Sequence, residues 1–176
     1  NAYVGNFFVN ARRPDEIKRA LIAYEKGDSI YEKLGKRNPT LHFNRGMAAK
    51  YMEDYDLALR SFSTAHEIGA SGAAEQGRQV WDLVEKLADQ TEKKCELKVK
   101  RLKELVADFP GSEVCRTLKE LQAGDRSSVP LVVRVVSVLE RPGEVPVIVI
   151  CCDSSGDFFA LSFYNAELQK LGQAVV

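Results

Sequence analysis

The stretch Leu41–Ala70 constrains the fold of this chain more than any other part of its sequence. Gly46 lies in a first helical segment, and Ala58, Phe62 and Ala65 lie in a second one, with a polar turn between them. Two antiparallel helices that cross closely need small residues where they touch. An aromatic ring then fills the space beside the crossing. We therefore predict a helical hairpin over this stretch.

The spacing of these residues is that of a tetratricopeptide repeat, and a second, imperfect copy precedes it. Ala20, Tyr24 and Gly27 repeat the order small, aromatic, small at matching offsets. Any amphipathic hairpin places small residues at its crossing, but two copies with matching offsets favour the repeat interpretation. At least three repeats are usually needed to bury a solenoid core, so we expect further repeats before Asn1.

Three local features are predicted around these hairpins. Asp56 is expected to cap the second helix of the clearer hairpin through its side-chain oxygens. An extended stretch is expected at Phe7–Asp15, which separates the two helices of the earlier copy. A capping helix is expected over Ala73–Ala88, with an apolar stripe that includes Val80 and Trp81.

The C-terminal part of the chain changes from helical to strand-like patterning. After the helix-ending segment Phe109-Pro110-Gly111, β-branched and aromatic residues dominate Leu131–Leu139, Val145–Cys152 and Phe158–Tyr164. The order of these segments is that of an oligonucleotide/oligosaccharide-binding (OB) barrel. Such a barrel needs five strands, and this chain supplies about three. Completion by residues missing from this chain is the preferred interpretation, and strand exchange with a second copy is the alternative.

The predicted fold class is therefore α + β in separate domains. Tetratricopeptide helical hairpins with capping helices occupy residues 1–109, residues 110–128 form a linker, and an incomplete OB-fold barrel occupies residues 129–176. The number of earlier repeats and the oligomeric state are left open.

The first helices of tetratricopeptide hairpins line a groove that holds extended peptides. The candidates for this groove are Asn1, Phe43, Asn44, Met47 and Lys50. An asparagine amide can bond a peptide main chain from both its donor and its acceptor side. Lysine can pair with a carboxylate, and methionine adapts to an apolar side chain. The alternative is that Phe43 and Met47 simply pack between hairpins.

A basic segment, with Lys98, Lys100, Arg101 and Lys103, is a candidate for contact with ribosomal or other RNA phosphates. Interleaved glutamates make an ordinary solvated helix the alternative. The barrel aromatics suggest single-stranded nucleic-acid binding as a second function. However, residues 145–164 contain no lysine or arginine, which argues against phosphate binding on that face.

Composition and residue spacing argue against other function classes. Lys plus Arg equals Asp plus Glu at 25 each, so no global field attracts phosphate or anionic lipid. No apolar run approaches the roughly 18 residues that span a membrane. The four cysteines show no CxxC spacing, so we expect no metal and no cofactor. His42 and His66 lack a nucleophile or phosphate loop around them, so we predict no catalytic residues and no enzyme.

Short motifs run through both parts of the chain. In the helical part they are Asn1-Ala2-Tyr3, Asn38-Pro39, Leu41-His42-Phe43-Asn44-Arg45, Lys50-Tyr51 and Phe62-Ser63. Further on they are Lys98-Val99-Lys100, Val145-Pro146, Val149, Asp153-Ser154, Gly156 and Tyr164-Asn165. In these motifs and their order, the chain resembles the tetratricopeptide repeat protein 5 (Strap) family over nearly its whole length.

The resemblance implies a non-enzymatic adaptor for protein or peptide partners, located in the cytoplasm and the nucleus. It implies assembly of transcriptional coactivator complexes in the stress response. It also implies recognition of nascent tubulin at the ribosome, which leads to tubulin mRNA decay. Lys98 and Lys100 would then belong to a ribosome-contacting segment. Membrane attachment and specific DNA binding are not expected.

Overall fold

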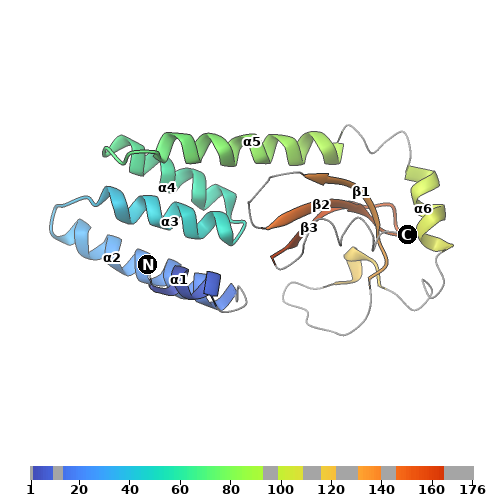
Figure 1. The fold of residues 1–176 in the computed structure, drawn as a ribbon, viewed down its shortest axis with the longest axis horizontal. Helices are drawn as coiled ribbons and strands as arrows, with labels where there is room; N and C mark the ends of the chain where they lie inside the picture. The colour runs from blue at the N-terminus through green and yellow to red at the C-terminus, as the bar shows by residue number, and fades with distance from the viewer. Residues whose placement is uncertain are drawn as a thin grey trace. The chain divides into compact units, whose positions relative to one another are not determined.

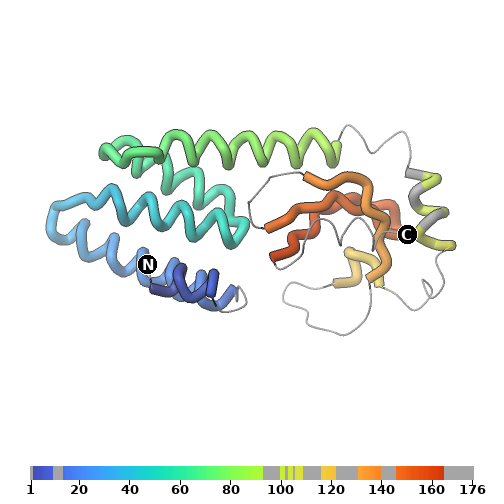
Figure 2. The backbone as a smooth tube through the Cα atoms, in the orientation of Figure 1, coloured from blue at the N-terminus to red at the C-terminus, as the bar shows by residue number. Residues whose placement is uncertain are grey.

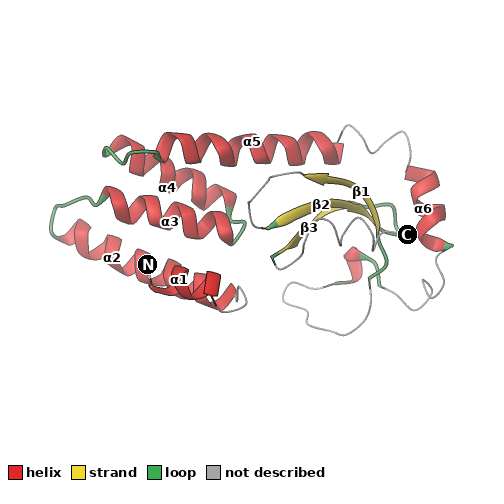
Figure 3. Cartoon of the chain, viewed as in Figure 1, coloured by secondary structure: helices red, strands yellow, loops and turns green. Residues whose placement is uncertain are grey.

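The computed structural model describes residues 2–9, 14–92, 99–108, 116–121, 131–139 and 146–164. Contacts divide the chain into two compact units, Asn1–Lys86 and Leu87–Val176. Among the residues that the structure describes, the first unit has helices joined by loops, whereas the strands lie in the second (Figure 3). The predicted order, helical hairpins followed by a separate β part, is confirmed. The predicted linker, residues 110–128, lies largely outside the described residues.

The first unit is a sequence of antiparallel helices. They are α1 (Ala2–Val9), α2 (Pro14–Lys33), α3 (Pro39–Tyr51), α4 (Tyr55–Glu67) and α5 (Ala73–Glu92), which continues into the second unit (Figure 1). In sequence order, α1 lies against α2, α2 against α3, and α3 against α4. The predicted capping helix over Ala73–Ala88 is present as α5 and runs four residues further.

The crossing of α3 and α4 depends on the glycine that the sequence singles out. A methyl group placed on Gly46 would lie 2.7 Å from the ring of Phe62. Ala58 and Ala65 of α4 are completely buried, and Phe62 is 1% exposed. Phe62 packs in a cluster with Ala49, Ala58 and Val80. The close hairpin with an aromatic plug is therefore confirmed.

Side-chain caps begin two of these helices. Asn38 accepts a hydrogen bond from the backbone N–H of Leu41 at 3.1 Å, at the start of α3. Asp54 accepts one from the N–H of Leu57 at 3.0 Å, at the start of α4. The prediction that Asp56 caps α4 is wrong, because α4 begins at Tyr55 and Asp56 already lies within its first turn. There Asp56 pairs with Arg60 at 2.7 Å, a surface contact.

The earlier hairpin differs from its prediction at its first helix. Phe7 and Phe8 belong to α1, so an extended stretch from Phe7 is wrong. The reason is tertiary: Phe7 is 1% exposed, and its ring lies 5.9 Å from that of Tyr51 on α3. Burying this ring favours a helix that continues to Val9.

The second unit contains a three-stranded antiparallel sheet in the order β1-β2-β3. Its strands are β1 (Arg134–Leu139), β2 (Val147–Cys152) and β3 (Phe158–Phe163), coloured orange to red in Figure 2. The pairing of β1 with β2 is irregular between Val135 and Ser137. Helix α6 (Val99–Ala107) and a short 3-10 helix, η2 (Leu118–Glu120), belong to the same unit.

Successive side chains along a strand point to opposite faces of the sheet, and this alternation shows which residues form the core of the unit. Val149, Cys151 and Phe159 share one face of the sheet and form a buried cluster. Leu118 and Leu131, from outside the three strands, pack against it. Ile148, Ile150 and Cys152 on the opposite face are also buried, so both faces of β2 are covered.

Candidate functional site

The structure places two of the predicted groove residues beside the core of the first unit. Phe43 and Met47 are partly buried and pack against the cluster around Phe62. The rings of Phe43 and Phe62 meet edge to face, with 5.8 Å between their centroids. Both side chains keep some exposure, so packing and partner contact are compatible at these positions. Their role in a groove stays a prediction.

Lys50 joins α3 to the capping helix α5. It is 9% exposed, and its Nζ donates to Oε1 of Gln76 at 3.4 Å. The contact links the last turn of α3 to the start of α5. Asn44, on the same helix as Lys50, is half-buried. Asn1, the remaining groove candidate, lies outside the described residues.

Asp28 forms a contact between α2 and α3 that the sequence did not predict. Its two carboxylate oxygens lie 3.3 Å from Nε2 of His42 and 3.3 Å from Nη1 of Arg45. The side chain of His42 is nearly buried. No sequence pattern indicates its pairing, because Asp28 lies on a different helix and in a different repeat.

An open depression of about 550 Å³ lies at the turn between α4 and α5. It is lined by His66, Gly69, Ala70, Ser71, Gly72, Ala74 and Glu75. The ring of Phe43 comes within 4.0 Å of a methyl group placed on Gly72. This groove candidate therefore lies next to the wall of the depression.

Trp81 corrects the predicted apolar stripe of the capping helix. Val80 is completely buried, but Trp81 is 54% exposed. Neighbouring residues on a helix lie about 100° apart around its axis, and the orientation of α5 turns Val80 toward the core and Trp81 away from it. The exposed indole is a candidate contact residue that the sequence reasoning assigned to packing.

The basic candidates in the second unit divide into exposed and packed side chains. Lys100 and Arg101 of α6 are exposed. Lys103 is half-buried, because its aliphatic stem crosses Gly156, where a methyl group would lie 2.8 Å from Cδ of Lys103. Gly156 has φ 86°, a backbone conformation that favours glycine. Lys98 lies outside the described residues.

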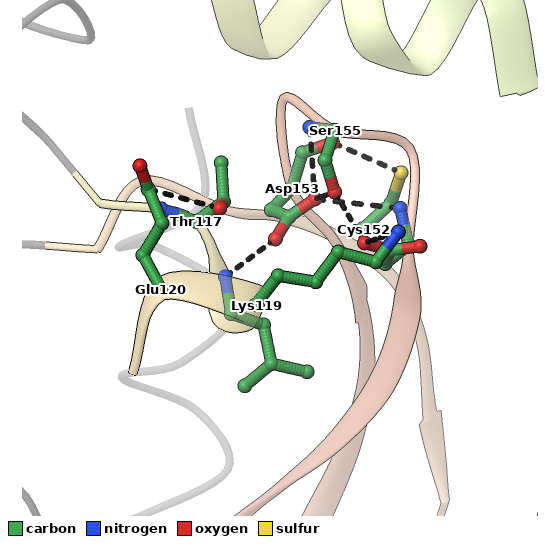
Figure 4. A network of polar contacts seen from close by, with 8 residues as sticks. Thr117, Lys119, Glu120, Cys152, Asp153 and Ser155 are labelled. Atoms are coloured by element: carbon green, nitrogen blue, oxygen red, sulfur yellow. Dashed lines mark hydrogen bonds and ion pairs between the residues drawn. The ribbon is translucent and has the colours of Figure 1, made fainter. Parts of the chain in front are cut away.

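Asp153 organises the turn between β2 and β3 (Figure 4). Its buried carboxylate accepts hydrogen bonds from the N–H groups of Leu118 at 2.8 Å, Ser155 at 3.0 Å and Asp157 at 3.3 Å. The Ser155 hydroxyl lies 2.6 Å from Oδ1 of Asp153. Because Leu118 begins η2, one carboxylate holds the turn closed and ties it to a distant segment. Its contacts identify Asp153 as a structural residue.

Asp157 carries a lowered pKa in the same turn. The hydrogen bond from Ser155 is the main cause, followed by the hydrogen bond from Lys119, whose Nζ lies 3.0 Å away. A lowered carboxyl pKa adds stability above the ordinary value, and this stability is lost as the pH falls through the lowered value.

We expect the substitution Ser155→Ala to raise the pKa of Asp157, because it removes the largest cause of the lowering. The measurement is a ¹³C NMR titration of the Asp157 carboxyl, with Ser154→Ala as the control, since Ser154 is exposed. An unchanged pKa of Asp157 in Ser155→Ala would contradict this assignment.

The two cysteines of β2 lie in surroundings that do not favour a nucleophilic role. Cys151 and Cys152 are both buried. Burial, and then the neighbouring Cys152, raise the pKa of Cys151 to about 11. The nucleophilic thiolate is therefore scarce at neutral pH. Within the described ranges, no group of three or more His, Cys, Asp or Glu side chains could hold a metal ion.

Comparison with known proteins matches both units. Residues 113–176 match the family model described as the tetratricopeptide repeat protein 5 OB fold domain. The chain is 27% identical over 186 residues to tetratricopeptide repeat protein 5 of Bos taurus, Homo sapiens and Mus musculus. The resemblance to tetratricopeptide repeat protein 5 is confirmed. Each alignment covers 94% of this chain and 42% of the relative, so the chain spans less than half the length of these relatives.

Two aromatic residues of the OB-type domain pack within its sheet. Phe159 is 9% exposed within the sheet core, and Phe163 packs against the same core. Both rings contribute to the packing of the sheet core. The part of the chain that the structure describes has no helix long and apolar enough to cross a membrane.

Proposed function

We propose that this chain is a non-enzymatic adaptor that binds protein or peptide partners through its helical repeats. The observation that supports it most is the similarity to tetratricopeptide repeat protein 5 across both units in chain order. The close α3–α4 hairpin supplies the rigid frame that a repeat surface needs.

We further propose the partners that the resemblance implies. These are the ribosome with nascent tubulin, leading to tubulin mRNA decay, and transcriptional coactivators in the stress response. Such a protein would work in both the cytoplasm and the nucleus. The exposure of Lys100 and Arg101 on α6 supports the ribosomal part, because exposed cations can reach RNA phosphates. Lys103 supports it less, since its stem packs on Gly156.

Replacing both Lys98 and Lys100 by glutamate is expected to weaken ribosome association, most strongly at low salt. The reason is that a lysine that neutralises a phosphate releases counterions. Losing one such lysine lowers the slope of the logarithm of the binding constant against the logarithm of the salt concentration by about one. The measurement is co-sedimentation with ribosomes over a series of salt concentrations.

The matched control replaces Lys33 and Lys36 by glutamate, because both are exposed and the change in net charge is the same. We expect this control to bind ribosomes more tightly than the Lys98 and Lys100 variant does. Equal binding by the two double variants would overturn the ribosomal part of the proposal.

A further inference from the structure

Trp81 is the chain's single tryptophan, and its side chain is not part of the buried core of the helical unit. Ala73, Val80 and Leu83 bury the inner face of α5, at 0%, 0% and 3% exposure. The indole of Trp81 lies outside this face and is 54% exposed. Large exposed aromatic side chains are enriched at binding surfaces, where they supply contact area at a low entropy cost.

The position of Trp81 in the repeat relates it to the candidate groove. Val80 and Leu83 lie 34 residues after Gly46 and Ala49, which is the length of one tetratricopeptide repeat, and all four are buried. The same offset relates Trp81 to Met47. Trp81 is therefore the α5 equivalent of Met47, which we predict to line the groove on α3.

The charges beside Trp81 select the kind of side chain that fits there. Arg78, one turn before, pairs with Glu75, so its charge is largely neutralised. Glu85, one turn after, and Asp82 are exposed. No ion pair joins either of them to another residue in the described part of the chain. Lys86, which follows Glu85 directly, is exposed as well. Counted together, Glu75, Arg78, Asp82, Glu85 and Lys86 carry a net charge of −1, so the indole lies beside a small net negative charge.

We infer that Trp81 and Glu85 bind an arginine or lysine side chain of the partner polypeptide. The cation would stack on the indole face while its N–H groups donate to the Glu85 carboxylate. This combination suits a guanidinium best, because it is planar and donates in a fixed fork. The inference rests on the proposed adaptor function and names the chemistry of its partner at α5.

The test uses three synthetic seven-residue peptides that differ only at the centre, which is arginine, citrulline or norleucine in a glycine–serine frame. Citrulline keeps the shape of arginine without the charge. NMR titration follows the indole N–H of Trp81 and the backbone amide of Glu85. We expect the arginine peptide to bind about tenfold more tightly than the citrulline peptide, from stacking and ion pairing together.

Two variants test the residues separately. Trp81→Leu keeps an apolar side chain but removes the aromatic face, and Glu85→Gln removes the charge. We expect each to weaken arginine-peptide binding by about threefold. The control Glu25→Gln removes an exposed carboxylate from α2 and should leave this binding unchanged.

Equal binding of the arginine and citrulline peptides, or no binding of either, would overturn the inference. Tighter binding of the norleucine peptide would also overturn it, in favour of an apolar contact. Ribosome co-sedimentation and coactivator capture by Trp81→Leu test the adaptor function independently. If these persist while the peptides fail to bind, the adaptor proposal stands and only the cation site fails.

Discussion

Replacing Phe62 by alanine is expected to lower the free energy of unfolding of the helical unit by about 3–5 kcal/mol. Phe62 is 1% exposed and contacts Gly46, Gly77 and the ring of Phe43. Its removal leaves a cavity between α3, α4 and α5, and rigid helix backbones can close this cavity only in part. The measurement is urea denaturation followed by far-UV circular dichroism.

Phe8→Ala is the matched control, because it deletes the same ring from a position that is 43% exposed. We expect it to lower the free energy of unfolding much less than Phe62→Ala does. A complementary variant, Gly46→Ala, should also destabilise the unit, by about 1–3 kcal/mol, since it crowds the same ring. Similar costs for Phe62→Ala and Phe8→Ala would show that the hairpin core is not centred on Phe62.

Replacing Asp153 by alanine is the second large change, with an expected loss of about 2–4 kcal/mol in the stability of the β unit. Asp153 is completely buried and accepts three backbone N–H groups. Without the carboxylate, the N–H of Leu118 loses its partner in a partly buried place. The hydrogen bond that joins η2 to the β2–β3 turn would then be lost.

Hydrogen exchange at the amides of Leu118 and Ser155 measures this effect directly, together with urea denaturation. Both amides should exchange faster in Asp153→Ala. The control is Ser154→Ala, which changes an exposed side chain in the same turn. Unchanged protection of Leu118 in Asp153→Ala would show that the segment is held by other contacts.

The comparison of Asp54 with Asp56 shows where sequence reasoning about helix ends fails. Both residues can cap a helix, and they are two positions apart. The choice depends on which backbone N–H groups are free, and therefore on where the chain leaves α3. The contact of Asp54 with Leu57 follows from that geometry. Element types were thus predictable here, whereas the end of a helix was not.

Among the candidate site residues, too, the sequence predicts the residue type that is present but not whether its side chain is exposed. Lys100 and Lys103 look alike in sequence, but one is exposed and the stem of the other packs over Gly156. Val80 and Trp81 both look apolar, but the orientation of α5 buries one and exposes the other. Such differences depend on packing partners that lie far away along the chain. No local pattern contains this information.

By itself, the sequence determined the helical hairpin, its aromatic plug, and the change from helices to an OB-type sheet. These follow from local periodicity and from small residues at fixed spacing, which are properties of neighbouring positions. Only the tertiary structure decided the burial of Phe7, the contact of Asp28 with His42 and Arg45, and the tie from Asp153 to Leu118. Each of these joins residues whose proximity arises when separate elements pack together.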